Sequence, residues 1–72
     1  MGIFKVRIIP KNIVREVNIP GRSEIKVYEL LKALNYVVEE VVVTRGGSEI
    51  LTEYDTVREG DDIVVFLAPS GG

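Results

Sequence analysis

One amphipathic helical stripe stands between two groups of strand-like runs, and that order limits the folds open to this chain. The stripe has the spacing i, i+3, i+4, i+7 and consists of Val27, Leu30, Leu31 and Leu34. Ser23 is the best N-cap ahead of it, and Asn35 suits the left-handed residue that ends a helix. We therefore expect one helix that packs its apolar face on a core and carries no chemistry of its own.

Two runs before the helix alternate between apolar and polar residues. They extend from Ile3 to Ile9 and from Ile13 to Ile19, with the turn residues Pro10-Lys11-Asn12 between them. Val17 and Ile19 are expected to face inward in the second run. Together the two runs predict a β-hairpin.

A β-branched run from Val41 to Thr44 predicts a strand after the helix. It stops at Arg45-Gly46-Gly47, which we interpret as a tight turn and not as a phosphate loop, because no helical periodicity follows the glycines. The segment from Ser48 to Leu51 is expected to pair back on this strand.

The segment from Thr52 to Glu59 is polar and irregular, and Tyr54 and Val57 are its expected core residues. A turn then leads into a last strand from Ile63 to Leu67. The acidic residues of that turn lack the ligand spacing of a calcium loop, so we interpret them as solvated, and no metal site is expected.

The 72 residues suffice for one domain, and one helix covers only one face of a sheet. The expected fold is α+β, a mixed four- to five-stranded sheet wrapped on one main helix. If Ile63, Val65 and Leu67 face that helix, the opposite face carries an uncovered apolar patch. The patch predicted for partner docking consists of Phe66, Val64 and Val42.

The composition disfavours most enzyme classes, because the chain contains no Cys and no His. Its basic residues are scattered and the formal net charge is −2, so nucleic acid is not the expected partner. No long apolar run predicts a membrane span, and no secretory signal is visible. We expect a cytoplasmic protein, as a monomer or a weak dimer through the apolar face, that binds no cofactor of its own.

The sequence ends in two glycines after a short segment that follows the last strand. We divide the chain into a domain at 1–67 and a flexible tail at 68–72. A chain that stops at Gly72 offers its terminal carboxylate on a thin rod, which another protein's narrow channel admits. The tail residues expected to thread such a channel are Gly71, Ser70, Pro69 and Ala68.

The order of elements resembles the β-grasp fold, and two segments carry a closer likeness. The helix at Val27–Leu34 and the stretch Thr56–Phe66, followed by Gly71-Gly72, resemble ThiS/MoaD-type sulfur carriers of the ubiquitin-like β-grasp superfamily, ThiS most of all. Lys26 stands where many members have Ser or Thr before the helix. The chain also resembles, more distantly, ubiquitin and archaeal ubiquitin-like modifiers.

The resemblance implies a carrier that is a substrate and not a catalyst. In that family a ThiF/MoeB-like adenylating enzyme uses ATP and magnesium to activate the terminal glycine, here Gly72. Sulfur attack then gives a thiocarboxylate, which passes sulfur to a sulfur-accepting synthase in thiamine or molybdopterin biosynthesis. Two alternatives stay open: a ubiquitin-like modifier conjugated through Gly72 to lysines, and a non-covalent β-grasp interaction module.

Overall fold

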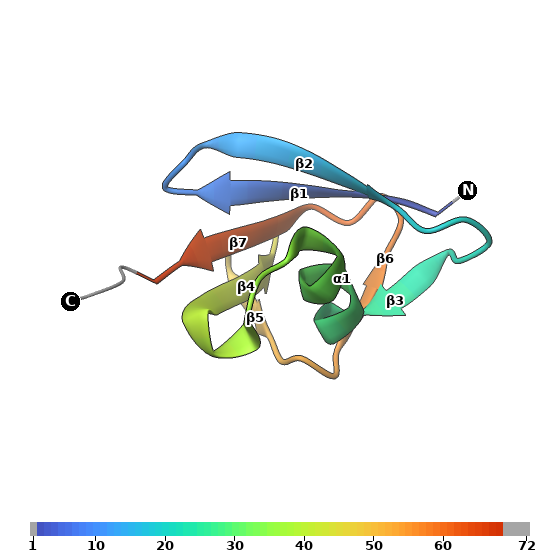
Figure 1. Ribbon diagram of the computed structural model, residues 1–72. Coiled ribbons are helices and arrows are strands. Elements are labelled where there is room, and N and C mark those ends of the chain that lie inside the picture. The colour runs from blue at the N-terminus through green and yellow to red at the C-terminus, as the bar shows by residue number, and fades with distance from the viewer. Residues whose placement is uncertain (1, 69–72) are drawn as a thin grey trace.

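The computed structural model describes residues 2–68 as seven strands, one α-helix and one short 3₁₀ helix (Figure 1). In chain order the elements are β1 (Ile3–Ile9), β2 (Ile13–Asn18), β3 (Glu24–Lys26), α1 (Val27–Leu34), η1 (Val38–Glu40), β4 (Val41–Arg45), β5 (Glu49–Leu51), β6 (Thr56–Arg58) and β7 (Ile63–Leu67).

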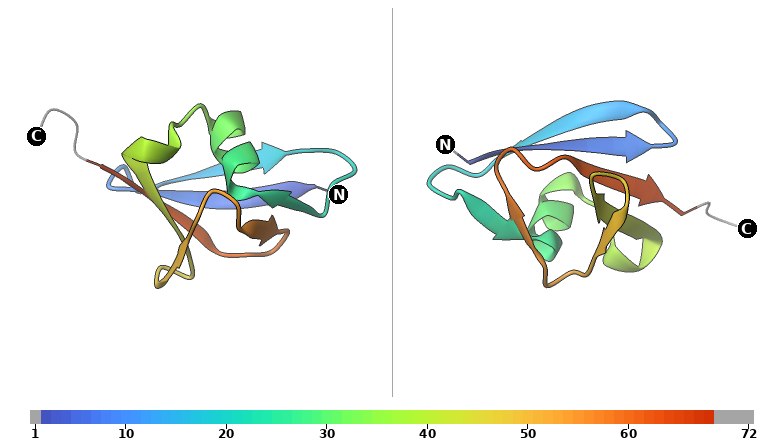
Figure 2. Two further views of the ribbon diagram at one scale, coloured as in Figure 1. Left: turned by 90° about the horizontal axis from the view of Figure 1, so that it is seen from below. Right: turned by 180° about the vertical axis from the view of Figure 1, so that it is seen from behind.

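Five strands form a mixed sheet in the order β2-β1-β7-β4-β5. The central pair, β1 and β7, is parallel, and the other neighbours in this sheet are antiparallel. Figure 2 (left) shows α1 lying on one side of the strands. The predicted α+β architecture, a mixed sheet wrapped on one helix, is confirmed.

The core fills the space between α1 and the inner face of the sheet. All four residues of the helical stripe are buried, and Asn35 ends the helix at φ 66°, as predicted. Every second residue of the strands faces the helix and packs on these four side chains. The strand residues with a period of 2 and the helix residues with a period of 3.6 therefore form one core cluster. The strand residues of this cluster include Phe4, Val6, Ile8, Val17, Val43, Leu51, Ile63 and Val65.

The start of α1 corrects one prediction, because Lys26 and not Ser23 occupies the N-cap position. The carbonyls of Asp55 and Glu53 accept hydrogen bonds from the N–H groups of Val27 (2.9 Å) and Tyr28 (3.0 Å). Backbone groups of a distant loop therefore do the capping that a Ser or Thr side chain commonly provides. No residue spacing in the sequence predicts that these two carbonyls lie at the start of the helix.

The segment after β5 is more ordered than the sequence indicated. Thr56–Arg58 forms β6, which pairs with β3 in a small second sheet. Val57 is fully buried, as predicted, whereas Tyr54 is 70% exposed, so its assignment to the core was wrong. Its ring packs edge-on against Tyr28 on the surface, with 6.3 Å between the centroids.

The chain before β1 is fastened at Gly2. This residue has φ +77°, and a Cβ there would lie 1.9 Å from the carbonyl oxygen of Ile19, so only glycine fits. The Glu59 carboxylate accepts hydrogen bonds from the N–H groups of Ile3 (3.0 Å) and Gly2. These donors lower the pKa of the Glu59 carboxyl below its ordinary value of 4.5.

This lowered pKa predicts a stability that depends on pH. A carboxyl whose pKa is lower in the folded state stabilises the fold above its unfolded pKa, and the contribution disappears as the pH falls through the folded pKa. Glu59→Gln should therefore reduce the free energy of unfolding at pH 7, and the difference from wild type should shrink below pH 4.5. Urea titrations between pH 2.5 and 7 measure the difference in the free energy of unfolding, with Glu16→Gln on the exposed face of β2 as the control. An equal difference at every pH would contradict this role.

Candidate functional site

The face of the sheet opposite α1 carries an apolar row near the end of β7. Ile9 on β1, Phe66 on β7 and Val42 on β4 occupy neighbouring register positions. Phe66 is 36% exposed and Val42 is 45% exposed. We call these two side chains the docking patch. Neither belongs to the core cluster, so their exposure leaves them available for a partner.

Val64 was predicted to belong to this patch, and its exposure was predicted wrongly. It lies on the expected face, outside the core cluster, but its side chain is only 5% exposed. β7 is the central strand, and the register places Arg7 and Thr44 on either side of Val64. Because the long arginine stem and the buried threonine flank a short side chain, Val64 lies below the surface that a partner meets.

The end of β7 is held in the sheet up to its last residue. Leu67 pairs with Val41, and the N–H of Ala68 donates to the carbonyl of Glu40 at 2.9 Å. Figure 1 shows β1 and β7 pointing to the same end of the molecule, which also carries the turn between β1 and β2. The predicted tail residues Pro69, Ser70 and Gly71 and the activation residue Gly72 lie outside the described residues.

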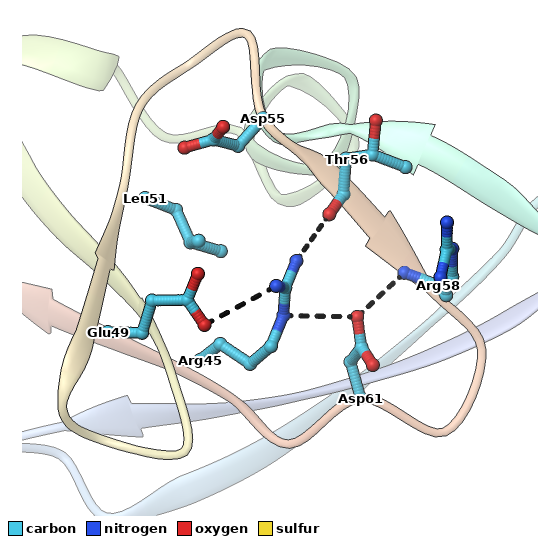
Figure 3. Close-up of a pocket in the computed structure, with 7 residues that line it drawn as sticks. All are labelled: Arg45, Glu49, Leu51, Asp55, Thr56, Arg58 and Asp61. Carbon is cyan, nitrogen blue, oxygen red and sulfur yellow. Dashed lines mark hydrogen bonds and ion pairs between the residues drawn. The ribbon is translucent and has the colours of Figure 1, made fainter.

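A polar pocket of about 370 Å³ lies at the other end of the strands, around Arg45 (Figure 3). The guanidinium donates to the Thr56 carbonyl at 2.5 Å and lies 3.4 Å from carboxylate oxygens of both Glu49 and Asp61. Asp61 also accepts a hydrogen bond from the Arg58 N–H at 2.9 Å. Arg45 thus joins β4, β5, β6 and the turn before β7.

This arrangement favours a structural role for the Arg45 pocket. Both Nη atoms of the arginine donate to acceptors within the protein. The buried Nε makes no hydrogen bond within the described part of the chain but lies in an ion pair with Asp61, so an anion would have to displace these groups. Gly46 and Gly47 form the predicted turn, both with positive φ, and the Gly46 N–H donates to the Asp62 carbonyl at 2.7 Å. The turn is therefore engaged with the chain before β7.

The described residues limit the possible chemistry in two ways. Within residues 2–68, no group of three or more His, Cys, Asp or Glu side chains is placed to hold a metal ion. No helix in this range is long and apolar enough to cross a membrane. The docking patch and the end of β7 are the described features that offer a surface to a partner.

Comparison with known proteins supports the resemblance drawn from the sequence. No family model matches the chain. Among solved structures, the fold is similar to the crystal structure of the thiamine biosynthesis protein ThiS from Geobacter metallireducens, with a TM-score of 0.61 and 27% sequence identity. The match covers 96% of this chain and 99% of that one. The likeness to ThiS and the β-grasp fold are thereby confirmed.

The Arg45 contacts predict a specific loss of stability. Arg45→Met keeps the aliphatic stem but removes the bonds to Thr56, Glu49 and Asp61, so we expect a loss of about 1–2 kcal/mol in the free energy of unfolding. Arg58→Met is the matched control, because the Arg58 side chain is 72% exposed and should contribute less than about 1 kcal/mol. Urea denaturation of the two variants compares them. Equal losses would show that Arg45 is an ordinary surface arginine.

Proposed function

We propose that this protein is a sulfur carrier whose Gly72 carboxylate is adenylated and converted to a thiocarboxylate. The observation that carries the proposal is the similarity to ThiS over nearly the whole of both chains. The Gly71-Gly72 pair at the end of the sequence supports it, because glycines without a Cβ pass through a narrow groove. The proposal requires Gly72 to be the last residue of the mature chain.

The chemistry begins with a carboxylate that is a poor electrophile. With a pKa of about 3.3–3.7, a terminal carboxyl is an anion at neutral pH and resists nucleophiles. An oxygen of the Gly72 carboxylate attacks the α-phosphorus of ATP, and magnesium pyrophosphate leaves. The resulting acyl-adenylate has AMP as its leaving group. Hydrosulfide then attacks the acyl carbon, AMP departs, and a thiocarboxylate is left on Gly72.

A protein-bound persulfide serves as the sulfur source equally well, with one more step. Its terminal sulfur attacks the acyl carbon and expels AMP, which leaves an acyl disulfide between carrier and donor. A thiol then reduces the disulfide bond, and the thiocarboxylate is released. In either route the catalytic groups belong to a ThiF/MoeB-like adenylating enzyme, and this chain supplies the substrate.

The described geometry supports this division of labour. Ala68 is held by the Glu40 carbonyl, so the four residues from Pro69 to Gly72 are the length available for threading. Four extended residues at about 3.3 Å each span about 13 Å. Pro69 restricts the backbone of this segment and so lowers the entropy that threading costs. The docking patch, Phe66 and Val42, lies beside the start of the tail.

Docking by this patch would orient the tail toward the partner's active site. Phe66 and Val42 are adjacent in the register, and aromatic side chains such as Phe66 are enriched in protein interfaces. The sulfur-accepting synthase would meet the same surface after activation. We propose the cytoplasm as the compartment, because activation consumes ATP, and we propose that the carrier acts as a monomer or weak dimer.

Intact mass tests the proposal directly. The full chain is incubated with a ThiF-like enzyme, magnesium-ATP and sulfide, and the expected product gains the mass of one sulfur minus one oxygen. A chain lacking Gly72 is the matched control and should stay unchanged. Adducts on partner lysines would instead indicate a protein modifier, and complete absence of adenylation would leave a non-covalent interaction module.

The difference between Phe66 and Val64 gives a second prediction. Phe66→Asp should leave the fold intact and slow pyrophosphate release by about tenfold or more, because it places a charge in the docking patch. Val64→Asp should instead destabilise the protein by about 2 kcal/mol or more, because a carboxylate would replace an apolar side chain that is only 5% exposed. Urea denaturation and a pyrophosphate assay on both variants separate the effects. An unfolded Phe66→Asp variant would overturn the assignment of the patch.

A further inference from the structure

Charge is unevenly distributed across the sheet. Residues 1–36, which include β1, β2 and α1, contain seven basic and three acidic side chains, a formal charge of +4. Residues 37–56, which include β4 and β5, contain one basic and five acidic side chains, a formal charge of −4. β2 and β5 are the opposite edges of the sheet, so the acidic segment forms the β5 edge, which we call the acidic edge, and the β2 edge belongs to the basic segment.

The acidic edge also contains an apolar groove of about 490 Å³. Its origin is a difference in strand length: β5 pairs with β4 only along Val43–Arg45, so β4 extends past it at Val41 and Val42. Both valines line the groove together with Val38 and Leu51. Among the described residues that line it, Glu53 is the only charged one.

Two large apolar side chains that are unusually exposed form the rim of this groove. Ile50 is 72% exposed and Tyr54 is 70% exposed, and both line it. Aromatic side chains such as Tyr54 are enriched where proteins bind other proteins, and contiguous exposed apolar surface marks such sites. Glu53 stands next to Tyr54, so an apolar rim and an acidic group face the same space.

The rim is held in place before any partner arrives. Thr52 N–H donates to the Asp55 carboxylate at 2.7 Å, and the Tyr54 N–H donates to the Thr52 hydroxyl at 3.3 Å. The carbonyls of Glu53 and Asp55 are bonded to the first turn of α1. A rim that is already ordered reduces the entropy lost on binding, so it favours a role of these exposed side chains in recognising a partner.

We propose that this groove binds a basic, apolar-anchored segment of a partner protein. An apolar side chain of that segment enters between Val41, Leu51 and Tyr54, and flanking Lys or Arg side chains face Glu53 and the acidic edge around it. Charge complementarity selects a cationic occupant, since Glu53 lines the groove and most of its other lining residues belong to the segment 37–56, with its formal charge of −4. The inference goes beyond the proposed function and does not use the tail or its chemistry.

Three blocked pentapeptides test the proposal against ¹⁵N-labelled full-length protein. The first alternates lysine and leucine, the second has glutamate in place of lysine, and the third has serine in place of leucine. The first should bind at least about tenfold more tightly than either of the others, because each control removes one half of the recognition. Its binding should weaken from 50 to 300 mM salt. Chemical shifts should change at Val42, Ile50 and Tyr54.

Variants locate the site and guard against non-specific attraction. Glu53→Lys and Tyr54→Ser should each weaken the first peptide by about fivefold to tenfold, because both side chains are on the rim. Glu16→Lys on β2 makes the same change of charge at the opposite edge of the sheet and should leave binding within about twofold. Dispersed spectra of all three variants confirm that they are folded.

Other results would overturn the proposal. Equal binding of the lysine–serine peptide would mean general charge attraction, and shift changes confined to other surfaces would place the site elsewhere. Absence of binding by the first peptide would also reject it. The β2 edge of a second copy, which carries Arg15, is the competing occupant. Shift changes at Ile50 and Tyr54 that grow with protein concentration and vanish in Arg15→Glu would assign the groove to self-association. A failure of Gly72 adenylation changes none of these readings.

Discussion

A single helix can bury only one face of a five-stranded sheet, and the organisation of this protein follows from that limit. α1 covers the face that carries Phe4, Val6 and Val65, and the packing of these residues against Leu30 provides the common core. The other face must then be compatible with water or with a partner. The exposed pair Phe66 and Val42 lies on that face, next to the end of β7, where any tail is delivered.

Patterns within one element were predictive, and contacts between distant elements were not. The helical stripe, the Asn35 terminus and the main strands follow local periodicity, so the sequence was sufficient for them. The capping of α1 at Lys26 uses carbonyls from a loop more than twenty residues away, which no local rule detects. The small β3–β6 sheet escaped prediction for the same reason, because three-residue strands have too short a pattern.

The exposure of single side chains in the candidate site also depends on contacts between elements that the sequence pattern does not reveal. Alternation assigned Val64 to the correct face but could not tell that its register neighbours cover it. Apolar character alone placed Tyr54 in the core, although a tyrosine at a loop tip also stabilises its surroundings by packing on another ring. Exposure is a property of the assembled surface, so burial follows from neighbours that only the fold supplies.

The position of β7 has a consequence for how the protein is made. The strand that fills the middle of the sheet, between β1 and β4, is the last strand within residues 2–68. During vectorial synthesis the earlier strands leave the ribosome with a gap at the centre of their sheet, and this gap closes only when residues 63–67 emerge. A chain that stops before residue 63 therefore leaves β1 and β4 without the strand that joins them, and the core cluster lacks Ile63 and Val65.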